Sequence, residues 1–187
     1  MPGRILGSLI GATFGLVYVI VNSGSLPSIA TWVVRGLGVA DFLALVVLAV
    51  RATRHAEPAT GVSTRGSPFG AGYWTVVLVE AVALIVGTRL LSGPLDRPDA
   101  GVAWVSIVVG VHFFALAVVF RLPFFHLLGA AITVCGVVGL LLALLGSSTA
   151  DVDVVAGLLP GALLLAAAWW GVRTGFRVRL RAGDPSS

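Results

Sequence analysis

The sequence has no lysine, and all twelve basic residues among its 187 residues are arginines. Schiff-base chemistry at a lysine, including the attachment of retinal, is therefore excluded. There is a single cysteine, Cys135, so the chain can form neither an intrachain disulfide nor a Cys-x-x-Cys metal or redox site. Charged residues make up only 11% of the chain, about half the share of an ordinary soluble domain. These shortages point away from soluble enzymes and toward a protein of the membrane.

Sequence patterns that mark common catalytic sites are also missing. The chain contains no G-x-S-x-G nucleophile elbow, no H-E-x-x-H zinc motif and no phosphate-binding loop. Because no nucleophile–base pair can be recognised, we do not expect an enzyme, and we expect no cofactor. The net charge of +4 does not indicate nucleic-acid binding, since the arginines lie near the ends of apolar runs, where membrane topology explains them.

What the chain has in abundance is apolar sequence. Hydrophobic residues make up 58% of it, and its mean hydropathy is +1.05. About 20 apolar residues suffice to cross a bilayer as a helix. Glycine, proline and polar clusters divide the chain into six such runs. We therefore predict one all-α domain over residues 1–187, an integral membrane bundle of six transmembrane helices at residues 5–21, 29–50, 73–91, 102–120, 124–145 and 154–172. Residues 51–71 are predicted to form a flexible loop, residues 146–153 a short loop, and residues 173–187 a basic tail.

The first apolar run could be read as a secretory signal peptide, but its glycines favour a retained helix. They recur every four residues, which places them on one helix face. Such a face lets another helix backbone approach closely. A second pair with the same spacing occurs in the sixth run. The residues predicted to pack helices in this way, within the chain or between copies in a homo-oligomer, are Gly3, Gly7, Gly11, Gly15, Gly157 and Gly161.

Arginine placement predicts the orientation of the bundle. With six spans, the two termini, the 51–71 loop and the turn at residues 121–123 share one side. That side holds Arg4, Arg51, Arg54, Arg65, Arg121, Arg173, Arg177, Arg179 and Arg181. The positive-inside rule then places both termini in the cytoplasm, as expected for a multi-pass protein of the cell membrane in contact with its lipids. The tryptophans lie near predicted helix ends, as in an aromatic interfacial belt: Trp32, Trp74, Trp104, Trp169 and Trp170.

Three titratable residues are predicted to lie near the middle of the bilayer. At about 1.5 Å per residue, Asp41, Glu80 and His112 each lie roughly 15 Å below the outer ends of their spans. A charge at this depth costs on the order of 2.5–3.5 kcal/mol, so such residues usually face a partner, a ligand or water. We hypothesise that the three form one polar cluster. Arg35 is shallower and is expected to extend outward.

The same residues are the candidate ligand-binding site. Asp41, Glu80, His112 and Arg35 would supply polar contacts, and Phe113 and Phe114 an apolar wall. Two other interpretations stay open. The polar residues could make separate hydrogen bonds that only hold helices together. A histidine and two carboxylates are also a plausible metal-ligand set, but no local metal-binding motif supports it, so no metal is expected.

The stretch GVHFFALAVVFRLPFFHLLGA, residues 110–130, resembles one found in small, uncharacterised multi-span bacterial membrane proteins. This resemblance implies a membrane location and no particular activity. Six spans with both ends in the cytoplasm is also the layout of Insig-type sterol-regulatory proteins. From the sequence we expect a protein that binds a lipid or small hydrophobic ligand, or that transports a small solute or protons. The alternative is a structural or regulatory protein that acts through helix contacts.

Overall fold

The computed structural model describes residues 2–54 and 71–182, and within them the side-chain surroundings of residues 5–51, 74–119 and 121–174. These ranges contain helices and no strand. The long helices are α1 (Pro2–Asn22), α2 (Ser28–Arg54), α3 (Ala71–Ser92), α4 (Gly101–Phe120) and α5 (Phe124–Leu144), and η1 (Pro98–Ala100) precedes α4. The last span joins α6 (Thr149–Asp153), the π-helix η2 (Val154–Leu158) and α7 (Leu159–Ala182). Six helices are long and apolar enough to cross a membrane, which confirms the predicted all-α architecture.

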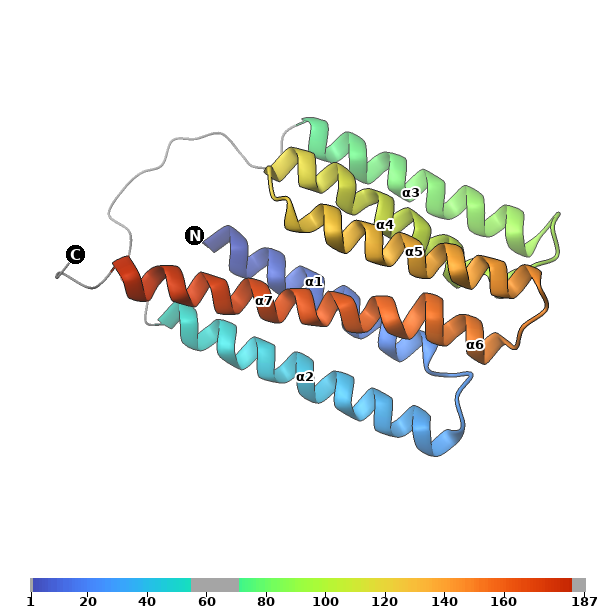
Figure 1. Cartoon of the computed structure of the whole chain (residues 1–187), viewed down its shortest axis with the longest axis horizontal. Helices are drawn as coiled ribbons and strands as arrows, with labels where there is room; N and C mark the ends of the chain where they lie inside the picture. The colour runs from blue at the N-terminus through green and yellow to red at the C-terminus, as the bar shows by residue number, and fades with distance from the viewer. Residues whose placement is uncertain (1, 55–70, 183–187) are drawn as a thin grey trace.

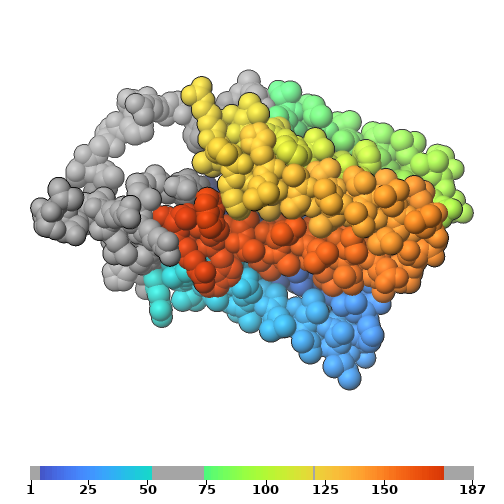
Figure 2. All heavy atoms as spheres, viewed as in Figure 1, coloured from blue at the N-terminus to red at the C-terminus, as the bar shows by residue number. Residues whose placement is uncertain are grey.

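Two closely packed helix pairs form the centre of the bundle, and one helix flanks each side (Figure 1). Helix α4 packs on α5, and α1 packs on α7. Helix α3 packs on α4 at one edge, whereas α2 packs on α1 and α7 at the opposite edge. On the face shown in Figure 2, α7 therefore runs between α5 and α2. The beginning of α1 and the end of α7 lie at the same end of the bundle (Figure 1).

Glycines bring α4 and α5 into backbone contact. A Cβ atom added to Gly110 would lie 2.6 Å from the backbone nitrogen of Thr133, and one added to Gly129 would lie 2.8 Å from the carbonyl oxygen of Gly110. A Cβ atom on Gly136 would lie 2.7 Å from the backbone nitrogen of Ile107. No side chain fits at these positions without moving a helix. Glycine spacing in the sequence did not predict this interface.

The glycines that the sequence analysis did identify have different surroundings. Gly15 and Gly161 are in backbone contact between α1 and α7, since a Cβ atom on Gly15 would lie 2.9 Å from the carbonyl oxygen of Gly161. Gly157 packs against the side chain of Asn22. By contrast, within the described ranges nothing lies within 4 Å of a Cβ atom placed on Gly7 or Gly11. Gly3 lies outside the residues whose surroundings the structure describes. Helix α1 therefore uses only part of its predicted glycine face for packing within the chain.

The predicted loop at residues 146–153 is in part helical, which corrects the sequence analysis. Ser148 caps the start of α6, because its hydroxyl oxygen accepts a hydrogen bond of 3.2 Å from the backbone N–H of Asp151. Ser, Thr and Asp are typical of a helix start, which explains why this polar segment becomes helix. Helix α7 then continues to Ala182, so the predicted tail is helical over residues 173–182.

The other predicted breaks lie between helices. Helix α4 ends at Phe120, and Arg121 adopts the left-handed conformation with φ of 53°. Helix α5 begins directly after Pro123, whose fixed φ suits a helix start. Most of the predicted 51–71 loop lies outside the described residues, but α2 extends through Arg54 at its beginning.

Candidate functional site

The structure brings Glu80 and His112 together between α3 and α4. The Oε2 atom of Glu80 lies 2.9 Å from the Nδ1 atom of His112, and their side chains are 20% and 15% exposed. The two groups are close enough for an ion pair when the histidine is protonated, although the contact lacks the alignment of a hydrogen bond. Both residues lie well inside their helices, so this contact is far from either end of the bundle.

A tryptophan near the start of α4 makes a second polar contact between α3 and α4. The indole N–H of Trp104 donates a hydrogen bond of 3.0 Å to the carbonyl oxygen of Ala83. Gly87 makes room for the ring, since a Cβ atom there would overlap the indole. Trp104 was interpreted as an interfacial residue, but its polar group is directed into the contact between α3 and α4. The half-buried face of α3 thus carries Glu80, Ala83 and Gly87 toward α4.

Asp41 has a different partner. Its Oδ1 atom accepts a hydrogen bond of 2.7 Å from the indole N–H of Trp169 on α7. Its Oδ2 atom is buried without a hydrogen-bond partner within the described ranges. Because α2 packs on α1 and α7, Asp41 lies on the opposite side of the bundle from α3. The hypothesised three-residue cluster therefore separates into a Glu80–His112 contact and an Asp41–Trp169 contact. Among residues 5–51, 74–119 and 121–174 there is no group of three or more metal-ligand side chains.

Arg35 reaches away from Asp41, as the sequence analysis expected. Its Nε–H donates a hydrogen bond of 2.9 Å to the hydroxyl of Ser23, and its Nη2 group donates one of 3.0 Å to the carbonyl oxygen of Ile20. The carbonyls at the C-terminal end of a helix lack intrahelical partners and carry partial negative charge. Arg35 thus satisfies the end of α1, and its guanidinium is occupied by this structural contact.

The predicted aromatic wall packs against other rings. Phe113 contacts Phe125, with ring centroids 5.7 Å apart, and Phe114 contacts His126 at 6.0 Å. Phe124 stacks on Trp170 of α7 at 4.3 Å. These rings fill the space between α4, α5 and α7. In the structure, Phe113 and Phe114 are therefore packing residues at a helix interface.

A buried polar contact that the sequence analysis missed connects α1, α4 and the π-helix. Ser106 is fully buried, and its hydroxyl donates to the carbonyl oxygen of Ala156. Pro160 has no N–H, so it cannot supply the usual helical hydrogen bond to this carbonyl four residues earlier. The hydroxyl of Tyr18 lies 3.4 Å from that of Ser106. Pro160 within an apolar run could have predicted such a contact. A proline leaves a backbone carbonyl of the preceding turn without its helical partner, and in an apolar helix that carbonyl needs another donor.

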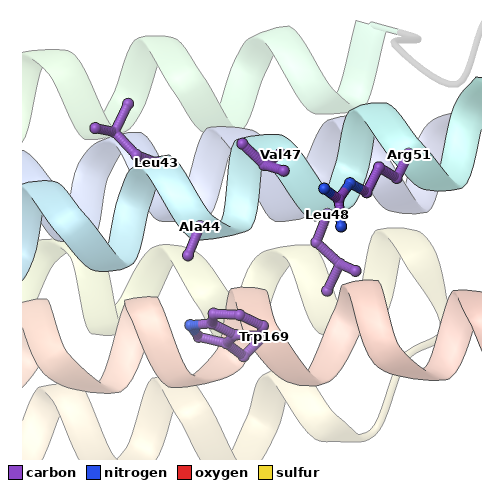
Figure 3. A pocket seen from close by; sticks show the side chains of 6 residues that line it. All are labelled: Leu43, Ala44, Val47, Leu48, Arg51 and Trp169. Atoms are coloured by element: carbon purple, nitrogen blue, oxygen red, sulfur yellow. The ribbon is translucent and has the colours of Figure 1, made fainter.

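An apolar groove lies between α2 and α7, next to the Asp41–Trp169 contact (Figure 3). Its volume is about 400 Å³, and it is a shallow depression that is widely open to the outside of the bundle. Leu43, Val47 and Arg51 follow one another along α2, while Ala44 and Leu48 point toward the indole of Trp169 (Figure 3). The groove-lining residues are Leu43, Ala44, Val47, Leu48, Arg51 and Trp169.

Positive charge is concentrated at one end of this groove. Arg51 is exposed and has no ion-pair or hydrogen-bond partner within the described part of the chain. The guanidinium of Arg173 lies over the ring of Trp169, 5.0 Å from its centroid, at a distance typical of a cation–π contact. Trp169 lies near the end of the last candidate span, Thr149–Thr174, as predicted, and its indole N–H is directed into the contact with Asp41.

Comparisons of the chain with protein-family models, curated proteins and solved structures found no match. The side-chain geometry of the six long helices is therefore the basis for a functional assignment. Two features distinguish it: the paired Glu80 and His112 between α3 and α4, and the groove between α2 and α7.

Proposed function

We propose that this chain is a membrane-embedded protein that binds a lipid in the groove between α2 and α7. The observation that carries this proposal is the combination of an apolar groove of about 400 Å³ with an arginine at one end and an Asp–Trp hydrogen bond beside it. Ligand pockets are typically concave and mostly apolar, with a few polar groups that fix orientation. An amphipathic molecule matches such a groove.

The surroundings of the groove favour a ligand that enters from the bilayer. Leu43 is 56% exposed and Val47 is 49% exposed, so the groove opens on an apolar outer face of α2. In a bilayer this face meets acyl chains, and no aqueous path is needed for a lipid to reach it. Transport through the protein would instead require the mid-membrane polar groups to line a route, whereas Glu80 and His112 face each other between two helices.

Filling the groove is expected to remove bound lipid. In the Ala44→Trp variant, the large ring would occupy the space between α2 and Trp169, so we expect lipid adducts to fall by at least about tenfold, the loss of roughly 1.4 kcal/mol of binding free energy. The measurement is native mass spectrometry of protein extracted in mild detergent. Ala81→Trp is the matched control, because Ala81 is exposed on α3, outside the groove.

The control defines what each result means. Wild type and Ala81→Trp should retain the same lipid adducts, while Ala44→Trp should lose them and remain folded by circular dichroism. Wild-type protein without any adduct, or an Ala44→Trp variant with undiminished adducts, would contradict the proposal.

A second candidate function, self-association through α1, is favoured by one specific observation. Gly7 and Gly11 share a helix face, and none of the described residues has an atom within 4 Å of a Cβ atom placed on either of them. A second copy of this chain could pack its own α1 on that face, as glycine pairs four residues apart allow.

Replacing Gly7 by leucine should therefore dissociate the dimer into monomers without destabilising the monomer. If α1 is the contact, Gly7→Leu shifts the protein from dimer to monomer in analytical ultracentrifugation in detergent, because the side chain keeps the helices apart. Gly36→Leu is the control, since Gly36 is an exposed glycine of α2 with nothing within 4 Å. A monomeric wild type, or a Gly7→Leu variant that stays dimeric, would count against this function.

A further inference from the structure

We infer that the ligand of the α2/α7 groove is an anionic phospholipid whose phosphate is bound by Arg51 and whose acyl chain lies along α2. This inference rests on the proposed lipid-binding function and specifies its ligand class. It draws on three features of the described residues: the isolated charge of Arg51, the direction of the groove along α2, and the charges of Arg173 and Asp41 beside the groove.

The charge of Arg51 is the first feature. Arg51 is the charged residue among the groove-lining side chains, and it has no partner among the side chains of residues 5–51, 74–119 and 121–174. Its planar guanidinium presents several N–H donors in a geometry that matches a phosphate. Charge-assisted hydrogen bonds of this kind are stronger than neutral ones. An unpaired arginine at the end of an apolar groove thus provides a site for an anionic head attached to an apolar chain.

The direction of the groove is the second feature. Leu43, Val47 and Arg51 are spaced four residues apart, so they lie on one face of α2. The run from Leu43 to Arg51 is about 12 Å long, at about 1.5 Å per residue. An acyl chain lying along it would contact Leu43 and Val47 while its headgroup reaches Arg51. Figure 3 shows these side chains in sequence along the helix, opposite Trp169.

The charges around the groove specify the sign of the headgroup. Arg173 adds a second cation beside Trp169. Asp41 lies ten residues before Arg51 on α2, and its carboxylate is held by Trp169. An anionic headgroup is attracted to the arginine end and disfavoured at the Asp41 end, which gives the lipid one orientation. A net negative headgroup therefore fits better than a zwitterionic one.

The arginine end of the groove is also the end of the bundle where α1 begins and α7 ends (Figure 1). The positive-inside rule assigns this end to the cytoplasmic leaflet, which is rich in anionic lipids.

A competition between two phospholipids tests the headgroup assignment. Full-length protein in detergent is mixed with equal amounts of phosphatidylglycerol and phosphatidylcholine that carry identical acyl chains, and the bound lipids are compared by native mass spectrometry. Wild type should retain phosphatidylglycerol over phosphatidylcholine by about fivefold or more, because one arginine near an anionic lipid contributes about 1 kcal/mol. Arg51→Gln should reduce this ratio to nearly one, and Arg51→Lys should keep part of it.

Arg89→Gln is the matched control. It removes the same charge from an exposed position near the end of α3, at the opposite end of the bundle from Arg51. This variant should keep the wild-type preference, whereas an equal loss in both variants would mean that net charge, and not the groove, sets the ratio. That result would overturn the inference.

The outcomes separate this inference from the proposed function. If wild type binds both lipids equally, or if Arg51→Gln keeps the preference, the phosphate assignment is wrong, while the groove still stands if Ala44→Trp removes both lipids. If Ala44→Trp leaves lipid binding unchanged, the groove itself is not the site and both proposals fail.

Discussion

Gly110→Leu is expected to destabilise the bundle more than any other substitution proposed for this chain. The reason is that Gly110 faces backbone atoms: even a single added carbon would lie 2.6 Å from the Thr133 nitrogen and 2.9 Å from the Gly129 oxygen. Backbone atoms of a helix cannot move aside as a side chain can. Leucine at this position would therefore separate α4 from α5, the most closely packed pair of helices in the structure.

The smaller Gly110→Ala change allows this effect to be measured in a protein that still folds. Overpacking of a well-packed interior typically costs about 1–3 kcal/mol, and the backbone contacts place Gly110→Ala toward the upper end of this range. The measurement is the free energy of unfolding in a denaturing-detergent titration, followed by circular dichroism. Gly110→Leu should fail to reach the folded state at all in this assay.

Gly36→Ala is the control for this prediction. Gly36 lies within α2, is exposed, and has nothing within 4 Å of a Cβ atom. Alanine is the better helix former by about 1 kcal/mol, so this variant should be as stable as wild type or slightly more stable. A Gly110→Ala variant with wild-type stability would show that α4 and α5 are less closely packed than the structure describes.

The contrast between these two glycines shows which features the sequence could predict. The helices and most of their ends follow from hydropathy, proline and polar turns, which are local properties. The six spans and the break at Arg121 were therefore predictable. Whether a glycine faces another helix or the outside of the bundle depends on how distant helices pack. Spacing alone favoured Gly7 and Gly11, which have no close neighbour in the part of the chain that the structure describes, and it missed Gly110.

The candidate site also combines a property that the sequence predicts with one that it does not. The depth of a residue along its helix is predictable, but the direction of its side chain is not. Residue counting predicted a similar depth for Asp41, Glu80 and His112, because helical rise is constant. The side of the bundle that each residue faces is set by tertiary packing, so depth could not reveal that Asp41 bonds to Trp169, 128 positions later in the chain. The groove was missed for a related reason, since its residues belong to α2 and α7 and form no local pattern.

Removing His112 should be costly only while Glu80 is present, and this is the second large effect expected. The Oε2–Nδ1 distance of 2.9 Å means that His112→Ala leaves a half-buried carboxylate without its partner. At a pH where His112 is protonated, breaking a buried ion pair from one side costs about 3–5 kcal/mol, and the partial exposure of these side chains favours the low end. After Glu80→Gln no carboxylate remains to be isolated, so His112→Ala should then cost only lost packing, about 1 kcal/mol.

A double-mutant cycle converts this difference into a coupling energy. Free energies of unfolding are measured for wild type, Glu80→Gln, His112→Ala and the double variant, and the packing loss at residue 112 cancels because it occurs in both backgrounds. We expect a coupling of about 2 kcal/mol, within the range of residues in direct contact. Additive losses would mean that the two side chains do not interact in the folded protein.

A second cycle tests whether Asp41 belongs to the same contact. Asp41→Asn combined with His112→Ala should be additive to within about 0.5 kcal/mol, because Asp41 bonds to α7 and His112 faces α3. Asp41→Asn combined with Trp169→Phe should not be additive, since these two residues share a hydrogen bond of 2.7 Å. Coupling of Asp41 to His112 but not to Trp169 would restore the three-residue cluster that the sequence suggested. It would also shift the search for a ligand from the α2/α7 groove to the middle of the bundle.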